Sequence, residues 1–286
     1  TNLIRREVKR WGIENGVSFY DILRHEGFLR TMQVRLCRTG ELMVNLVVSY
    51  ADEKLLNQLM AHLMERFPAI TTLLYTINGK MNDSLHGLNP VIYHGNGYVI
   101  EKLEGFAFKI GPKSFFQTNT AQAERLYQVA RDLAGLKGTE TLYDLYCGTG
   151  SIGIFLSKLA HRVIGVELIP EAIADARENA ALNQVSHADF FTGDVSEICN
   201  DSFFAEHGRP EVIITDPPRA GMAPKLLEKL LEIGAEKIIY VSCNPATQAR
   251  DLQLLSEKYA VAAIQPVDMF PHTHHIENVT GLFLKH

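Results

Sequence analysis

One stretch, TLYDLYCGTGSIG at residues 141–153, constrains the fold of this chain more than any other. Its apolar start predicts a short buried strand over 142–146, and the glycines that follow predict a tight turn over 147–150. A helix is predicted from Ser151, where apolar residues recur at helical spacing. Glycine permits backbone angles and close approaches that a Cβ would block. A strand that runs through such a turn into a helix N-terminus presents backbone N–H groups to a polar or anionic ligand.

Three kinds of ligand could use this turn, and the neighbouring residues help to separate them. A phosphate-binding P-loop requires a lysine directly after its glycines, and this sequence has none there. Residues 148–153 fit the G-x-G-x-x-G spacing of a dinucleotide site, although a turn without a ligand fits it as well. A second strand predicted over 162–167 ends in Glu167, an acid placed to accept hydrogen bonds from ribose hydroxyls. Asp144 adds a carboxylate beside the turn, which opposes a pyrophosphate and tolerates a cationic sulfonium.

From residue 112 onward the sequence alternates between strands and helices, which is typical of an α/β fold with a doubly wound, mostly parallel sheet. The predicted strands cover residues 141–146, 162–167, 189–192, 211–215 and 236–242, and the predicted helices cover 119–134, 151–160, 170–182, 223–233 and 246–258. Two further strands, at 260–268 and 279–285, have no helix between them. Gly111-Pro112 marks the expected junction, so we predict one domain over 1–111 and another over 112–286.

The first 111 residues predict a smaller domain of mixed α+β type with mostly antiparallel strands. A basic helix is expected first, then a break near residues 12–16 and another helical turn. Asp52 is a suitable N-cap for the next predicted helix. The other predictions are a hairpin of strands 28–36 and 41–50, a helix over 52–67, a strand over 70–77, a second hairpin of strands 91–93 and 98–103, and a strand over 105–110.

Composition limits the classes of protein that the chain can belong to. With 286 residues, 46% of them hydrophobic, the chain can bury a sizeable core, and no apolar run is long enough to predict a transmembrane helix. Its four cysteines are far apart, which argues against a disulfide framework or zinc site and favours a reducing, cytoplasmic location. The formal net charge of −5 does not mark a nucleic-acid-binding protein. The excess of basic residues near the N-terminus fits either a phosphate-binding face or ordinary solvated charges.

Several short motifs occur in a fixed order along the second half of the chain. They are SFFQTN at 114–119, DLYCGTG at 144–150, GVE at 165–167, DPPR at 216–219, SCNPATQARD at 242–251 and HTHHIENV at 272–279. In these motifs the chain resembles the S-adenosylmethionine-dependent RNA uracil-5-methyltransferases, which include the bacterial 23S rRNA and tRNA enzymes. The resemblance implies a class I methyltransferase sheet of seven strands whose last two strands are antiparallel. It also implies S-adenosyl-L-methionine as cofactor and RNA as partner, with 23S rRNA expected ahead of tRNA, and neither a membrane nor an obligate protein partner.

Uracil C5 becomes a nucleophile when a thiolate adds to C6, so this chemistry needs a cysteine and a base that removes the C5 proton. Cys243 follows a predicted strand and precedes a predicted helix, whose N-terminus lowers the pKa of a thiol. Taken alone, such a cysteine is more often inert and buried. The resemblance implies that Cys243 is the nucleophile and that Glu277 is the general base. The histidines at 272, 274 and 275 favour packing or RNA contact over a metal site.

The resemblance also assigns the remaining site residues. Phe115 and Phe116 precede Gln117, and we expect one of the two rings to stack on a flipped base and the other to lie in the core. Asp216 is expected to face the cofactor or the uracil edge. The implied cofactor-binding residues are Gln117, Tyr146, Gly148, Ser151, Glu167 and Asp216, and the implied substrate-binding residues are Phe115 and Asp216.

Other activities fit the motifs less well. Amine methyltransferases carry an aromatic residue where this chain has Arg219, and RNA cytosine-5 methyltransferases carry a cysteine that residues 215–221 lack. The alternatives are therefore tRNA uracil-5 methylation, RNA cytosine-5 methylation or an RNA-binding module without chemistry. Longer members of the resembled family carry an N-terminal OB-like domain and, in many, iron–sulfur cysteines. Neither feature lies in these residues, so we expect a fragment without an iron–sulfur cluster.

Overall fold

The computed structural model describes residues 1–285, which form two units. The N-terminal unit contains Thr1–Lys102 and Lys109–Ser114, and the C-terminal unit contains Leu103–Phe108 and the chain from Phe115 onward. No helix within residues 1–285 is long and apolar enough to cross a membrane.

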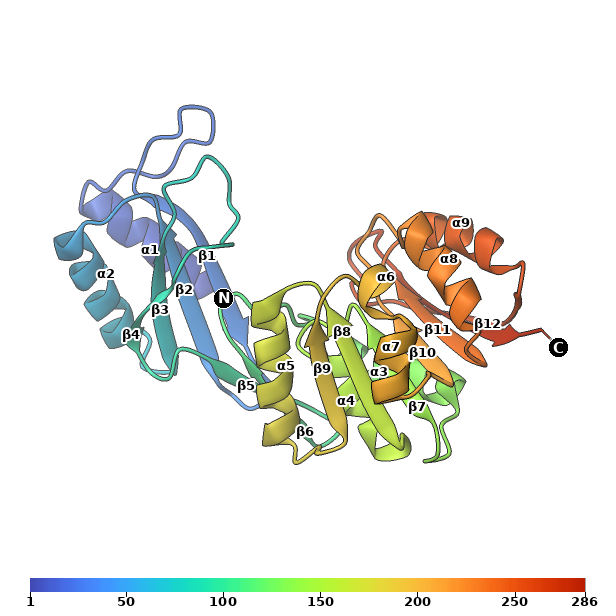
Figure 1. The fold of residues 1–286 in the computed structure, drawn as a ribbon. Helices are drawn as coiled ribbons and strands as arrows, with labels where there is room; N and C mark the ends of the chain where they lie inside the picture. The colour runs from blue at the N-terminus through green and yellow to red at the C-terminus, as the bar shows by residue number, and fades with distance from the viewer. Residues whose placement is uncertain (286) are drawn as a thin grey trace. The chain divides into compact units, whose positions relative to one another are not determined.

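The N-terminal unit is a four-stranded sheet with two helices packed against it (Figure 1). Its elements are α1 (Asn2–Glu14), β1 (Leu29–Leu36), β2 (Leu42–Val48), α2 (Glu53–Arg66), β3 (Thr72–Ile77) and β4 (Val91–His94), and the strand order is β1-β2-β3-β4. β2 pairs with β1 in antiparallel and with β3 in parallel orientation. The core contains Trp11 of α1 and Leu59 of α2. Asp52 caps α2, as predicted, by accepting a 2.9 Å hydrogen bond from the Leu55 N–H.

Two predictions for this part of the chain are wrong. Residues 15–28 contain no helix, because an isolated bridge between Asp21 and Glu26 closes a loop there. The second hairpin was expected between β4 and β5 (Val99–Leu103), but β4 pairs with β3, and β5 pairs with β6 (Phe106–Ile110). The turn between β5 and β6 contains Glu104 and Gly105, both at positive φ, which is the geometry of a tight two-residue hairpin.

The C-terminal unit is built on a seven-stranded sheet of order β12-β13-β11-β10-β7-β8-β9. Its parallel strands are β7 (Thr141–Leu145), β8 (Arg162–Glu167), β9 (Ala188–Thr192), β10 (Val212–Thr215) and β11 (Lys237–Ser242). β7 and β10 are buried along their whole length, as expected for strands with helices on both faces. β12 (Tyr259–Val267) and β13 (Glu277–Leu284) form the expected antiparallel pair, and β13 also pairs antiparallel with β11.

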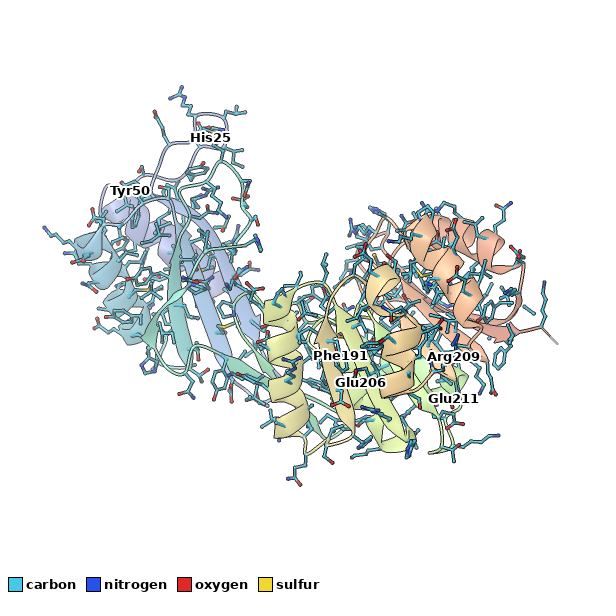
Figure 2. All side chains as sticks on the ribbon, viewed as in Figure 1. His25, Tyr50, Phe191, Glu206, Arg209 and Glu211 are labelled. Atoms are coloured by element: carbon cyan, nitrogen blue, oxygen red, sulfur yellow. The ribbon has the colours of Figure 1, made fainter. Side chains whose placement is uncertain are left out.

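The helices of this unit agree with the predicted alternation, with two additions (Figure 1). They are α3 (Thr120–Ala134), α4 (Ser151–Leu156), a 3₁₀ turn (Ser157–Leu159), α5 (Pro170–Leu182), α6 (Val195–Ile198), α7 (Asp201–His207), α8 (Pro224–Ile233) and α9 (Pro245–Leu255). The short helices α6 and α7 were not predicted. Asp194 and Asn200 cap them, and the Phe203 ring of α7 lies 5.0 Å from the Phe191 ring of β9, centroid to centroid. Figure 2 labels Phe191 of β9 and Glu206 of α7.

Candidate active site

The glycine turn after β7 has the left-handed backbone geometry that its glycines permit. Gly148 and Gly150 have φ angles of 52° and 74°, in the left-handed region. A Cβ on Gly150 would lie 2.9 Å from the Phe190 ring, so this position has no room for a side chain. Tyr146 also has a positive φ, of 61°, which is uncommon for a residue with a Cβ. The turn therefore keeps the backbone close to the sheet at the start of α4.

Glu167 ends β8 and is fixed by two backbone donors. One carboxylate oxygen accepts a hydrogen bond from the Gly148 N–H at 3.2 Å, and the other accepts one from the Ile169 N–H at 3.0 Å. Each oxygen retains acceptor capacity after these bonds. The structure thus brings Glu167 and Gly148, two predicted cofactor residues, into direct contact, with an acid oriented to accept hydroxyl donors.

Asp144 is a buried carboxylate with an incomplete set of hydrogen bonds. It is 1% exposed, and its Oδ2 accepts a hydrogen bond from the Gly153 N–H at 2.8 Å. Its Oδ1 is buried and has no partner in the described structure. Burial raises the pKa of Asp144 to about 7, the negative charge of Glu167 adds to the rise, and the Gly153 N–H opposes it. An unpaired buried acceptor favours a ligand with a donor or positive charge beside the turn.

Helix α3 contributes a residue that the sequence did not point to. The buried hydroxyl of Tyr127 lies 2.9 Å from the Ser151 Oγ at the first position of α4. Burial raises the pKa of Tyr127, and Asp216, Asp144 and Glu277 add to the rise, so Tyr127 shares its surroundings with these acids. Its only sequence signal is a tyrosine on the apolar face of an amphipathic helix, a pattern that equally fits an ordinary core residue.

The two phenylalanines before α3 have opposite environments. Phe116 is 3% exposed, and its ring centroid lies 5.5 Å from that of Phe108. Phe115 is 72% exposed. Gln117 follows them and is partly buried. One ring thus belongs to the core and the other is free to meet a ligand.

Cys243 lies between the end of β11 and the start of α9, and its side chain is partly exposed. Burial raises the pKa of its thiol, and the charges of Glu277 and Asp216 raise it further. The positive charge of Arg219 opposes the rise. The sequence predicted a lowered thiol pKa from the helix N-terminus. That prediction is wrong in direction, because burial and the charges of two carboxylates raise the pKa by more than Arg219 lowers it.

Glu277 reaches the same place from a later strand of the sheet. Asn278 pairs with Ser242 in the β13–β11 register, so Glu277 at the start of β13 lies beside the end of β11. Glu277 is 8% exposed, and burial raises its pKa to about 7 against the opposing charge of Arg219. Burial likewise raises the pKa of Asp216, which follows β10, to about 8, with Glu277 and Asp144 adding to the rise. A thiol, two acids and a guanidinium therefore converge at one edge of the sheet.

The histidines of the tail do not belong to this cluster of acids. His272 and His274 are exposed, and His275 is partly buried, in the loop between β12 and β13. Within residues 1–285, no group of three or more His, Cys, Asp or Glu side chains is arranged to hold a metal ion.

The sheet order and the site at the carboxyl ends of its strands define a class I methyltransferase fold, and comparisons with known proteins identify the family. Residues 91–286 match the tRNA (Uracil-5-)-methyltransferase family. The chain therefore belongs to this family, as the motifs predicted.

Among its relatives is an uncharacterized RNA methyltransferase from Bacteroides thetaiotaomicron, 49% identical over 100% of this chain and 63% of the relative. A second, from Porphyromonas gingivalis, is 51% identical over 92% of this chain and 57% of the relative. A similar solved structure is the Pyrococcus abyssi tRNA (uracil-54, C5)-methyltransferase in complex with S-adenosyl-L-homocysteine. It is 32% identical with a TM-score of 0.79, over 97% of this chain and 65% of that protein. The chain thus spans about three fifths of the length of these relatives.

Proposed function

We propose that this protein transfers a methyl group from S-adenosyl-L-methionine to C5 of a uridine in RNA through a covalent bond between Cys243 and C6. The observation that carries the proposal is the convergence of Cys243, Glu277 and Asp216, three groups from separate motifs. The β13–β11 register sets Glu277 beside the end of β11, Glu277 and Asp216 both raise the pKa of the thiol, and Glu277 raises the pKa of Asp216. A thiol nucleophile beside a carboxylate base is the pair that substitution at uracil C5 requires.

The residues around the glycine turn suit the proposed cofactor. S-adenosyl-L-methionine supplies an electrophilic methyl group on a positively charged sulfur. Glu167, held by two backbone N–H groups, is oriented to accept the ribose hydroxyls. The unpaired Oδ1 of Asp144 suits the positive charge of the methionine portion. Gln117, Tyr146 and the Gly148 backbone complete the proposed contacts.

The reaction begins when the Cys243 thiolate adds to C6 of uracil, forming an S–C6 bond and placing electron density on C5. C5 then bonds to the transferred methyl carbon, and the bond from that carbon to sulfur breaks. The Glu277 carboxylate removes the proton from C5, the electrons restore the C5–C6 double bond, and the S–C6 bond breaks to return the thiolate. A base with a pKa of about 7 combines an available ionised form with useful proton affinity at neutral pH.

Exposed Phe115 is the proposed stacking partner of the flipped uracil, because chemistry on an RNA base requires the base to leave its stack. We propose 23S rRNA ahead of tRNA as the target, although the motifs are shared by enzymes that act on either RNA. The matched family and the solved relative carry tRNA in their names. Both RNAs therefore belong in the test of the proposal.

The test uses RNA in which 5-fluorouracil replaces uracil, because fluorine at C5 does not leave as a proton does. With S-adenosyl-L-methionine, the wild-type protein should form an adduct that survives denaturation, and Cys243→Ala should form none. Cys199→Ala is the matched control, since Cys199 is buried away from this site and its loss should leave the adduct intact. Separate reactions with rRNA and tRNA identify the target.

No adduct with either RNA, despite measurable cofactor binding, would refute the covalent uracil reaction. Adducts from RNA that contains 5-fluorocytosine instead would favour cytosine-5 methylation. Retained RNA binding without any adduct would favour a binding module.

A further inference from the structure

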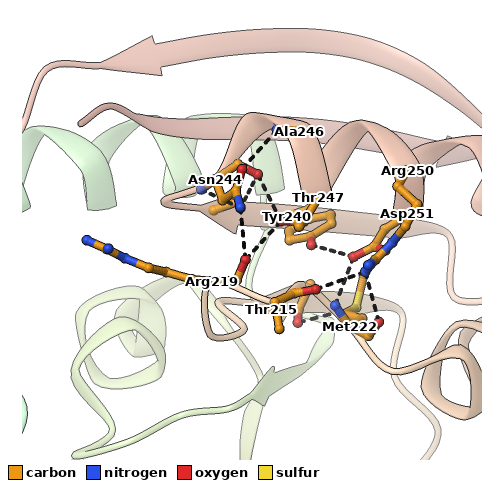
Figure 3. Close-up of polar contacts among 11 residues, drawn as sticks. Thr215, Arg219, Met222, Tyr240, Asn244, Ala246, Thr247, Arg250 and Asp251 are labelled. Atoms are coloured by element: carbon orange, nitrogen blue, oxygen red, sulfur yellow. Dashed lines mark hydrogen bonds and ion pairs between the residues drawn. The ribbon is translucent and has the colours of Figure 1, made fainter. Parts of the chain in front are cut away.

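The segment after the Asp-Pro-Pro motif is held by side chains of α9. We call Arg219–Met222 the 219–222 loop. The backbone carbonyl of Arg219 accepts hydrogen bonds from Asn244 Nδ2 at 3.0 Å and Thr247 Oγ1 at 3.2 Å (Figure 3). Asn244 is the N-cap of α9, the helix that follows Cys243, and Thr247 lies in its first turn. The loop is therefore fastened to α9 immediately beside the thiol.

Asp251, one turn further along α9, anchors the other end of the loop. Its side chain is 0% exposed, and its Oδ2 accepts hydrogen bonds from the Met222 N–H at 2.8 Å and the Tyr240 hydroxyl at 2.7 Å. Its Oδ1 accepts two hydrogen bonds from Arg250, at 2.9 Å from Nε and 2.6 Å from Nη2. Arg250 in turn donates to the Ala220 carbonyl at 3.0 Å. Four donors satisfy this buried carboxylate, which therefore supports the loop at little desolvation cost.

Gly221 shows how closely the loop approaches these two side chains. Its φ angle is +78°, and a Cβ there would lie 2.6 Å from Asp251 Oδ2 and 2.7 Å from Arg250 Nη2. Any other residue would displace the loop or the carboxylate. The loop is thus fitted to α9 along its whole length.

The same loop carries the one cation that opposes the acids around the thiol. In Figure 3 the Arg219 side chain points away from the α9 contacts, whereas its carbonyl is bound to them. The charge of Arg219 acts on both the Cys243 thiol and Glu277, lowering the pKa of each. The groups that influence the thiol are Arg219 and Asp216 from the chain after β10 and Glu277 from β13. Helix α9 therefore fixes the backbone of the loop that carries Arg219 relative to Cys243, which lies directly before the N-cap of the same helix.

We propose that Asp251 is a positioning residue that holds the 219–222 loop on α9 so that the Arg219 guanidinium stays beside Cys243 and Glu277. The proposal deepens the proposed function, because it takes Cys243 as the nucleophile. If the loop is released, the cation moves freely and the two carboxylates dominate the surroundings of the thiol. The thiolate then forms only at higher pH.

The test is the pH dependence of Cys243 alkylation by iodoacetamide, which reacts with thiolates. Mass spectrometry of the peptide that contains Cys243 separates this residue from the three buried cysteines. Asp251→Asn keeps the size of the side chain but cannot accept all four hydrogen bonds. Tyr259→Phe is the matched control, because it removes a buried hydrogen bond, from the Tyr259 hydroxyl to the Ala235 carbonyl at 2.9 Å, that does not involve the loop.

We expect the alkylation midpoint of Asp251→Asn to rise by about one pH unit, with no change in Tyr259→Phe. In an Arg219→Ala background, Asp251→Asn should add no further shift, because the cation it positions is gone. The turnover number should fall roughly tenfold while the KM for S-adenosyl-L-methionine stays constant, since Gln117 and Glu167 lie on other elements.

An unchanged alkylation midpoint in folded Asp251→Asn, or an equal shift in the Arg219→Ala background, would overturn the positioning role. If Asp251→Asn does not fold, Thr247→Val decides, because it removes the partly exposed hydrogen bond to the Arg219 carbonyl and, besides that, a local one to the Asn244 carbonyl at 3.1 Å. It too should raise the midpoint, and an unchanged midpoint there refutes the proposal. Alkylation needs no RNA, so its outcome is separate from failure of the 5-fluorouracil test.

Discussion

Replacing Asp144 by asparagine should stabilise the C-terminal unit, and increasingly so as the pH rises. The carboxylate is 1% exposed, and one of its oxygens has no partner. Asparagine has the same shape, and its side-chain oxygen can still accept the hydrogen bond from the Gly153 N–H. The substitution removes the buried negative charge. Burying an unpaired amide group has a cost as well, but that cost is the same at every pH.

The raised pKa of Asp144 sets the size of the pH-dependent difference in unfolding free energy between the two proteins. Burial raises it from 3.8 to about 7, so the folded state binds the proton more tightly than the unfolded state. Stability therefore falls as the pH rises from 3.8 towards 7 and is constant above that range. One pKa unit corresponds to about 1.4 kcal/mol. Between pH 5 and pH 8 the wild-type protein should lose about 2.5 kcal/mol that Asp144→Asn does not lose.

The assay is urea unfolding of both proteins, without cofactor, at pH 5, 6.5 and 8. Trp11 is the single tryptophan and lies in the core of the N-terminal unit, so its fluorescence identifies that unit's transition. Circular dichroism follows the whole chain, and its remaining transition belongs to the C-terminal unit. Acids that Asp144 does not influence contribute equally in both proteins and cancel in the difference. The pKa of Asp216, which the charge of Asp144 raises, falls in the variant and adds to its stabilisation at high pH.

A stability difference that is constant from pH 5 to pH 8 would refute this reasoning, because it would mean that Asp144 is ionised normally in the folded state. Tighter cofactor binding by Asp144→Asn would separately contradict the proposed role of the unpaired oxygen.

Three further outcomes follow from the site. Gly150→Ala should lower stability by about 2 kcal/mol more than Gly148→Ala in thermal unfolding, because both glycines have positive φ but a Cβ meets a ring only at position 150. Phe116→Ala should cost about 3–5 kcal/mol, whereas Phe115→Ala should change stability by less than about 0.5 kcal/mol yet weaken RNA methylation in a binding and turnover assay. The methylation rate should rise with pH through about 7, because Glu277 must lose its proton to act as a base, and a rate that falls over this range would exclude that role.

The parallel sheet could be predicted because its signals are local. Its strands are mostly apolar, and many helix starts have a recognisable signal, such as the Asn119 cap before α3 or the proline that begins α5, α8 and α9. The hairpin error has a specific physical cause. Gly95 resembles a hairpin turn, but its missing Cβ allows close packing, since a Cβ there would lie 2.1 Å from the Thr71 carbonyl oxygen. The true turn contains Glu104 at positive φ, a conformation that the identity of glutamate does not predict.

The same distinction holds for the candidate site: residues in recognisable motifs could be predicted, whereas roles that depend on contacts between distant segments could not. Cys243, Glu277 and Glu167 could be named because each belongs to a motif with a recognisable role. Asp251 lies in such a motif too, but its role depends on a loop that approaches α9 from a distant part of the sequence. The raised thiol pKa was missed for a related reason, since it depends on acids that only the folded sheet brings together.

The insertion of β13 between β12 and β11 has a consequence for how the protein is made. Translation proceeds from the N-terminus, and β13 is the last of the sheet's strands in sequence order, although it occupies an interior position. A nascent chain that has reached residue 276 already contains the proposed nucleophile and every proposed cofactor residue, but it lacks Glu277 and has a gap in its sheet. Synthesis of β13 closes the gap and delivers the proposed base in one event, so under the proposed mechanism a chain that ends before β13 cannot complete the reaction.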